Sequence, residues 1–439
     1  MRYREMKNSG AEWIGEIPTH WKKSKIKYCA TFMPTCDMSS LDDESKVTFT
    51  PMECIKNGFF ENRDSTLKTI KGSYTQYQDG DIVVAKVTPC FENGNIAIMR
   101  NLYSGFGFGS SELFVLRPHS INTSFLFYSL QSNSFIQAGK ASMTGTGGLK
   151  RVSSYTVVNY PIFLPPLAEQ EGITAYLDEK CAAIDEIIEQ AKATIEEYKA
   201  WKASVISEAV TKGLDHNAEM KDSGVEWIET MPKHWSCIPM KFMLNERNQK
   251  NDPVVTSERL SLSIDIGVTL YAEKTTNLDR FKEDVSQYKV AHAGDLVLNS
   301  MNMIVGAVGI APVLGCVSPA YYVFYDNDKN HTVTRYCDYV FKNKRLRGCL
   351  FSLGQGIMAI DRGDGRINTC RLKVSRDDLG RIMLPCPPIE EQRRIISYLD
   401  KQCAAIDGII AEKQTLIGEL ETYKKSLIFE TVTGKWRVC

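Results

Sequence analysis

Two glycine-rich stretches of the chain carry basic residues beside or between their glycines. Residues 145–151 read GTGGLKR, and residues 354–366 read GQGIMAIDRGDGR. Glycine lets a backbone come close to a phosphate, and arginine can donate two hydrogen bonds to guanine in the DNA major groove. The pattern therefore favours binding to nucleic acid. The candidate DNA-binding residues of the two stretches are Lys150, Arg151, Arg362 and Arg366.

More basic residues lie on a predicted helix and after a predicted strand. Lys86 follows a strand that opens at Gly80 and Asp81. A carboxylate and a lysine could also belong to a nuclease, but the matching turn at Asp295 has no such lysine, so we favour a strand-opening turn. Runs of charge are often only solvated faces, and that alternative stays open for every cluster. The helix over residues 336–350 suits phosphate contacts and contains Lys342, Lys344, Arg345 and Arg347.

The sequence contains no motif that would predict catalysis. It has no G-x-x-x-x-G-K-[ST] phosphate loop, and its glycine clusters lack the strand and helix context of a dinucleotide-binding fold. The Pro-Pro pairs are followed by helical patterns and not by the residues of a methyltransferase loop. Thirteen scattered cysteines form no C-x-x-C pair, and six histidines form no H-E-x-x-H. We therefore expect no catalytic residue and no metal site.

Length and charge indicate a multidomain protein that works inside the cell. A chain of 439 residues is too long for one core. No apolar run approaches the roughly 18 residues of a membrane span, and the charged N-terminus does not resemble a secretory signal, so a cytoplasmic protein is expected. The net charge is zero, yet residues 20–160 and 235–386 each carry four more basic than acidic residues. This excess points weakly to anionic partners, with random scatter as the alternative.

One long stretch occurs twice and must position these blocks. Residues 165–213 begin PPLAEQEGITAYLDEKCAAID, and residues 387–435 begin PPIEEQRRIISYLDKQCAAID, at an ungapped offset of 222 residues. Each copy predicts one helix that starts at its Pro-Pro pair.

Apolar residues recur along each copy at alternating steps of four and three, which is the period of a coiled-coil seam. Each helix therefore has a seam that it cannot bury alone, and we expect the two helices to pack on each other. The predicted seam residues are Leu177, Ile184, Ile188, Ile195 and Tyr198 in the first copy and Leu399, Ile406, Ile410, Ile417 and Leu420 in the second. Lys202 and Lys424 interrupt the apolar pattern.

A shorter repeat marks the start of each half. Residues 6–21 read MKNSGAEWIGEIPTHW, and residues 220–235 read MKDSGVEWIETMPKHW. The chain is thus two copies of one unit, and it ends where a third copy would begin, so its order is close to cyclic. Between the repeats lie two mixed α/β blocks with matching strands and dissimilar intervening residues. That is the pattern of one scaffold with two different binding surfaces.

The tandem order of the SG-x-EW…P-x-HW and PP-x-x-EQ motifs resembles the specificity (S) subunit of type I restriction–modification systems, over the whole chain. The resemblance implies an α+β fold in which two long antiparallel coiled-coil helices separate two mixed α/β target recognition domains. Each domain would read one half of a bipartite DNA target. The implied segments are a conserved N-terminal segment (1–20), recognition domain 1 (21–161), a central conserved region with a long helix (162–234), recognition domain 2 (235–383), and a C-terminal conserved region with a long helix (384–439).

The resemblance also implies partners. The chain itself would be non-catalytic and would bind no cofactor. Two modification subunits would dock on the helices and bring S-adenosylmethionine, and restriction subunits would bring chemistry that depends on ATP and Mg²⁺. Each repeated stretch predicts a helix of about 43 residues, which spans about 65 Å at ~1.5 Å per residue. That length is enough to set a spacer along double-stranded DNA. Two alternatives stay open: a coiled-coil scaffold without sequence reading, and an autonomous nuclease or methyltransferase.

Overall fold

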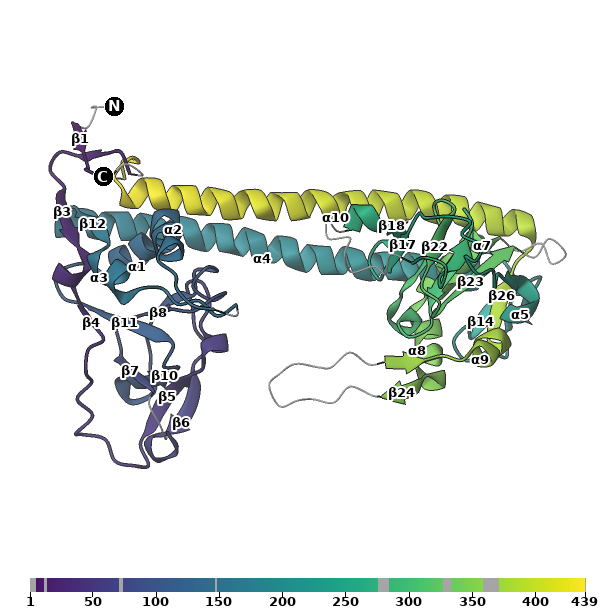
Figure 1. The fold of residues 1–439 in the computed structure, drawn as a ribbon, viewed down its shortest axis with the longest axis horizontal. Coiled ribbons are helices and arrows are strands. Elements are labelled where there is room, and N and C mark those ends of the chain that lie inside the picture. The colour runs from purple at the N-terminus through teal and green to yellow at the C-terminus, as the bar shows by residue number, and fades with distance from the viewer. Residues whose placement is uncertain are drawn as a thin grey trace. The chain divides into compact units, whose positions relative to one another are not determined.

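The computed structural model describes residues 5–11, 14–70, 74–146, 148–274, 284–326, 333–357 and 371–438. The chain forms two compact units, which are considered separately below. Unit 1 comprises Met1–Ala191 with Gln414–Cys439, and unit 2 comprises Lys192–Lys413 (Figure 1). Within the described ranges, no helix is both long and apolar enough to span a bilayer.

Two long helices each contribute to both units. They are α4 (Leu167–Lys212) and α10 (Ile389–Val432), and both begin just after their Pro-Pro pair, as the sequence predicts. In each unit a stretch of α4 lies beside a stretch of α10 (Figure 1). The fold class expected from the sequence is confirmed: mixed α/β blocks combined with paired long helices.

The predicted seam is most deeply buried along α4. Leu177, Ile184, Ile188 and Ile195 are buried, as are Leu399 and Ile406 of α10. Tyr198, Ile410, Ile417 and Leu420 are half-buried. Unit 1 packs Leu177, Ile184 and Ile188 into the same core as Leu427 and Ile428, and unit 2 packs Ile206 and Val210 with Leu399 and Cys403.

Unit 1 is built on two four-stranded sheets. One has the order β4-β11-β8-β9 and is antiparallel; the other has the order β6-β5-β10-β7, in which only the β5–β10 pair is parallel. Two-stranded pairs β1–β2 and β3–β12 complete the unit. The strands are β1 Met6–Asn8, β2 Glu16–Pro18, β3 Lys22–Lys25, β4 Ala30–Phe32, β5 Lys46–Thr50, β6 Arg63–Thr66, β7 Thr75–Gln78, β8 Ile82–Ala85, β9 Ile96–Ile98, β10 Phe106–Gly109, β11 Leu113–Pro118 and β12 Pro161–Leu164.

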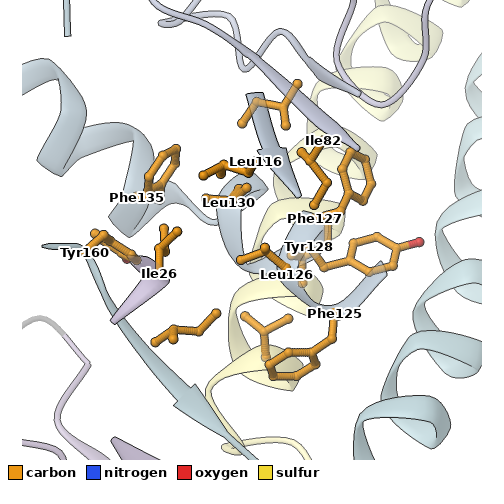
Figure 2. Packing of buried hydrophobic residues seen from close by; sticks show 14 of the residues in the cluster. Ile26, Ile82, Leu116, Phe125, Leu126, Phe127, Tyr128, Leu130, Phe135 and Tyr160 are labelled. Carbon is orange, nitrogen blue, oxygen red and sulfur yellow. The ribbon is translucent and has the colours of Figure 1, made fainter. Parts of the chain in front are cut away.

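Short helices connect the sheet of unit 1 to its part of α4. The helix expected over residues 125–136 is in fact two helices, because Ser132 leaves the helical conformation and caps the second one with its side chain. Side chains of α1 and α2 meet Ile82 and Leu116 of the sheet in one core (Figure 2). The helices are α1 Thr123–Gln131, α2 Asn133–Ala141 and α3 Ser154–Asn159, with 3₁₀ helices η1 Ile26–Tyr28, η2 Met52–Cys54, η3 Leu67–Thr69 and η4 Tyr103–Gly105.

Unit 2 repeats this plan. Its sheet β16-β23-β20-β21 has the same order as β4-β11-β8-β9, and Asn343 divides its paired helices as Ser132 does in unit 1. The strands are β13 Met220–Asp222, β14 Thr230–Pro232, β15 Ser236–Pro239, β16 Leu244–Glu246, β17 Leu260–Ser263, β18 Gly267–Leu270, β19 Lys289–Ala291, β20 Leu296–Asn299, β21 Val308–Ile310, β22 Gly315–Val317, β23 Tyr321–Asp326, β24 Gln355–Ile357, β25 Arg371–Lys373 and β26 Met383–Cys386. The helices are α5 Met240–Met243, α6 Tyr271–Lys274, α7 Thr334–Lys342, α8 Lys344–Leu353 and α9 Arg376–Arg381, with the 3₁₀ helix η6 Met303–Val305.

The residues that follow α10 pack on unit 1 in the same way as the residues that follow α4 pack on unit 2. A Cβ on Gly434 would lie 2.5 Å from Pro18 Cδ and 3.1 Å from the Trp21 ring. A Cβ on Gly213 would lie 3.1 Å from the Trp235 ring. Both glycines have positive φ, and both tryptophans are buried. The end of each long helix therefore packs on an H-W motif, which gives the near-cyclic order that the repeat predicts.

Candidate nucleic-acid interface

Three of the predicted DNA-binding residues of unit 1 come together at the glycine-rich hairpin. Thr144 and Arg151 pair across this hairpin, and Arg151 also pairs with Val87, which follows Lys86. The Thr88 amide donates to the Lys150 carbonyl at 3.0 Å, and the Lys150 amide donates to the Thr88 hydroxyl at 3.0 Å. These backbone contacts fix residues 86–88 beside residues 148–151. The structure thus brings the backbones of Lys86, Lys150 and Arg151 close together.

The Arg151 guanidinium is held by a carboxylate. Its Nε and Nη2 donate to Glu112 at 3.0 and 2.7 Å, while half of the side chain stays exposed. The hydrogen bonds from Arg151 hold the pKa of Glu112 below its ordinary value, and the positive charge of Lys86 adds to this effect. Arg151 therefore keeps an Nη1 edge for a further acceptor, and Glu112 fixes the direction of that edge. The Lys86 ammonium lies 5.4 Å from the centre of the Phe114 ring.

Unit 2 has a counterpart of this hairpin. The Val374 amide donates to the Ser300 carbonyl, as the Val152 amide donates to the Lys86 carbonyl, and Gln355 pairs with Lys373 where Thr144 pairs with Arg151. Lys373 is therefore the counterpart of Arg151, and it is exposed. The sequence interpretation missed it, although the 222-residue offset of the repeat would have found it. Arg362 and Arg366 lie outside the described residues.

The basic residues predicted on one helix of unit 2 belong to two helices and have different surroundings. Lys342 on α7 pairs with Asp338 at 2.8 Å, and Arg345 on α8 pairs with Glu229 at 2.7 Å. Arg347 donates to the Val305 carbonyl at 3.0 Å, and burial lowers its pKa. Lys344 and Arg345 are exposed, whereas Lys342 and Arg347 are half-buried. The surface that these four residues offer to a phosphate is thus smaller than the sequence suggests.

The two Gly-Asp turns carry structural carboxylates. Asp81 is buried and accepts from Nε and Nη2 of Arg117, both at 2.8 Å. Asp295 is buried and accepts from Nε and Nη2 of Arg247 at 2.6 and 3.1 Å. Each carboxylate also accepts from a backbone amide of its own turn. These contacts support the strand-opening role over a nuclease role.

The E-Q pair of each long helix connects it to the rest of its unit. Glu169 accepts from the His20 side chain at 2.7 Å, and its counterpart Glu391 contacts His234 at 2.8 Å. The following glutamine contacts the residue that precedes α1 or α7: Gln170 accepts from the Asn122 amide at 2.9 Å, and Gln392 accepts from the Val333 amide at 3.1 Å. The repeated motif thus attaches each mixed block to its helix.

A tyrosine–aspartate contact strengthens the same attachment in both units. Tyr128 of α1 donates to Asp178 of α4 at 2.6 Å, and Tyr339 of α7 donates to Asp400 of α10 at 2.5 Å. Both aspartates belong to the repeated Y-L-D motif. The repeated motifs therefore hold each block in place, and the residues that vary between the blocks form the exposed hairpin surfaces.

The described part of the chain offers no evident metal centre. Among these residues, no group of three or more histidine, cysteine, aspartate or glutamate side chains could hold a metal ion. The described cysteines are free thiols. The candidate interface consists of hydrogen-bond donors and positive charge, which suits binding to an anionic polymer.

Comparison with known proteins gives a consistent picture. Residues 18–197 match the family model described as the type I restriction modification DNA specificity domain. The chain is 35% identical over 189 residues to the type I restriction enzyme EcoAI specificity subunit of Escherichia coli, covering 42% of this chain and 32% of that protein. It is 34% identical over 232 residues to the EcoEI specificity subunit of Escherichia coli, covering 52% of this chain and 36% of that protein. The chain thus spans about a third of the length of these curated relatives.

The likeness in fold extends over 96% of the chain. A solved structure described as the structural basis of complex assembly and conformational transition of the type I R-M system contains a similar chain. The TM-score is 0.69 at 16% identity, with 96% of this chain and 99% of that chain covered. At this identity the likeness concerns the fold alone.

Proposed function

We propose that this chain, which belongs to the type I restriction–modification specificity subunits, is the DNA sequence-recognition subunit of such a system. The observation that carries the proposal is the duplicated unit with two different hairpins at one place in the fold. Unit 1 presents Lys86, Lys150 and Arg151 there, and unit 2 presents Lys373 on a hairpin of different length and sequence. A shared frame with two unlike exposed surfaces is what reading two different half-sites requires.

Each hairpin would contact the DNA of one half-site. Arg151, directed by Glu112, would donate to base edges, while Lys86 and Lys150 would contact phosphates. In unit 2, Lys373 and the predicted residues Arg362 and Arg366 would have the same role, with Lys344 and Arg345 nearer the backbone of the DNA. Lys342 and Arg347 would chiefly support α7 and α8, because both are engaged within the unit.

The chain would act through partner subunits. Two modification subunits would dock on the paired helices and carry S-adenosylmethionine, and restriction subunits would carry the chemistry that uses ATP and Mg²⁺. In this proposal the specificity subunit binds none of these cofactors, and its role is to select the DNA sequence that the complex binds. The helices would set the spacer between the two half-sites.

Exchange of one block tests the proposal. Residues 21–160 are replaced by the corresponding block of another specificity subunit, and methylated adenines are mapped in cells that express the complete modification complex. We expect one half-site to change and the other to stay, because each block reads its own half. The matched control exchanges residues 235–383 and should change the opposite half. If both halves changed in either exchange, or if methylation showed no sequence preference, the proposal would be wrong.

A further inference from the structure

A groove in unit 2 is lined by three basic and two acidic residues. It has a volume of about 660 Å³ and lies between α5, β16, β23 and α9. Its lining includes Arg376, Asp377 and Arg381 of α9 and Lys241 of α5. Asn245 and Glu246 of β16 and Phe324 of β23 also line it. A Cβ on Gly380 would lie 3.4 Å from Lys241 Cβ, so α5 and α9 pack closely at the floor.

One of these charges has a structural explanation. Arg376 forms an ion pair with Glu246, whose side chain is only 9% exposed. A buried carboxylate needs such a partner, and Arg376 is therefore accounted for within the fold. Lys241 and Arg381 also line the groove and are exposed, and the second carboxylate of the lining, Asp377, is exposed as well. The lining therefore has one more basic than acidic residue, and both cations that are not paired with Glu246 are open to solvent.

More positive charge lies beside the groove. Lys289 is half-buried and donates to the Tyr321 carbonyl at 2.9 Å. Burial lowers its pKa; Glu246 opposes this, and the positive charges of Arg376 and Lys373 lower the pKa further. Lys289 is therefore close enough to Arg376 and Lys373 to be repelled by both, and a bound anion would relieve that repulsion.

Unit 1 lacks this feature at the corresponding positions. Helix α3 has Ser154 and Asn159 where α9 has Arg376 and Arg381, and β4 has Phe32 where β16 has Glu246. Only Lys27, the counterpart of Lys241, is kept. Two of the three basic residues of the groove are thus specific to unit 2.

We propose that this groove binds the phosphate backbone of duplex DNA next to the half-site that unit 2 reads. The proposal rests on the function proposed above, because DNA is the polyanion that the chain would bind. The chain runs from Lys373 of the hairpin to Arg376 of the groove in three residues, at most about 10 Å. One duplex can therefore contact the hairpin and the groove together. The groove adds affinity in unit 2 that carries no sequence information.

The test is the salt dependence of DNA binding by the complete complex of this chain with its modification subunits. The variant Lys241→Gln with Arg381→Gln leaves the Arg376–Glu246 pair intact. Each lost phosphate contact lowers the slope of log affinity against log salt by roughly one. We expect the slope to fall by about one to two for target and unrelated DNA alike, with the methylated sequence unchanged.

The control removes the same charge elsewhere. Lys46→Gln with Lys68→Gln takes two exposed lysines from unit 1, where each pairs with a surface carboxylate. An unchanged slope in the groove variant, or the same fall in both variants, would overturn the proposal. A changed methylated sequence would instead place the groove in base reading, and loss of a modification subunit would make it a protein contact; either result also overturns it. Failure of the unaltered complex to select any sequence would refute the proposed function itself.

Discussion

At the scale of single residues, the arginine of unit 1 is fixed before any ligand arrives. Glu112 accepts two hydrogen bonds from the Arg151 guanidinium, and the backbone of Glu112 is positioned in turn because this residue immediately precedes β11. A guanidinium that is already oriented loses less freedom when it donates to a base. The pair contributes little to stability, since both side chains are partly exposed and surface ion pairs stabilise little. In the proposed function it would instead serve selectivity.

Substitution of Arg151 should relax one position of one half-site. We expect Arg151→Gln to lower discrimination at that base pair by about 1–3 kcal/mol, and Glu112→Gln to lower it by less. The measurement is methylation of targets altered at one base pair at a time. Because the pKa of Glu112 is lowered, its contact is present above pH ~4.5 and is lost as the pH falls through the folded-state pKa. Acidification should then lower the discrimination at this base pair in the same way as the Glu112→Gln substitution.

Arg100→Gln is the control for this prediction, because Arg100 is an exposed arginine of the same unit that contacts Ser124. It should leave every base preference as it is. Equal weakening of all targets by Arg151→Gln would show a phosphate contact in place of a base contact.

At the scale of elements, the lysines that interrupt the apolar seams explain the pairing of the long helices. Lys202 donates to both carboxylate oxygens of Asp407 at 2.8 and 2.6 Å within unit 2. Lys424 donates to both oxygens of Asp185 at 2.7 Å within unit 1. The two pairs are counterparts under the 222-residue repeat. A polar contact in an otherwise apolar seam favours one register over others, because any slip leaves the charges unpaired.

Reversal of one pair should show this preference. Lys202→Glu places two carboxylates together, and we expect a loss of about 1 kcal/mol, since the pair is partly exposed. Adding Asp407→Lys restores opposite charges and should recover most of that loss. The measurement is thermal unfolding of the four members of the double-mutant cycle at low and high salt. A double variant no more stable than the Lys202→Glu variant would count against the pairing.

At the scale of the whole molecule, the repeat makes the chain nearly cyclic. The end of α10 packs on Trp21 as the end of α4 packs on Trp235, so each unit draws its helices from both halves of the sequence. The E-Q and Y-L-D motifs then attach one variable block to each pair of helix stretches. The length of α4 and α10 is consequently a property that can change without altering either block.

Lengthening both helices should change the spacer of the DNA target. Insertion of one heptad into α4 and one into α10 at matching positions keeps both seams in phase and adds about 10 Å to each helix. We expect the same half-sites to be methylated with about three more base pairs between them. The methylation map of the complex measures this. Insertion of seven residues into the connector between α4 and β13 is the control and should leave the spacing as it was; an unchanged spacing in the helix variant would refute the role of the helices as a spacer.

The sequence by itself determined the repeat, the two long helices with their seams, and the presence of matching strands in the two mixed blocks. These follow from local periodicity and from the 222-residue offset, which need no knowledge of distant contacts. Only the tertiary structure decided what the charged residues do. Glu112 meets Arg151, Asp407 meets Lys202, and Val305 meets Arg347 across long separations in sequence. Runs of charged residues look alike in a sequence whether they face solvent or pair with another side chain. The reason is that the fold of the whole chain decides which residues come into contact.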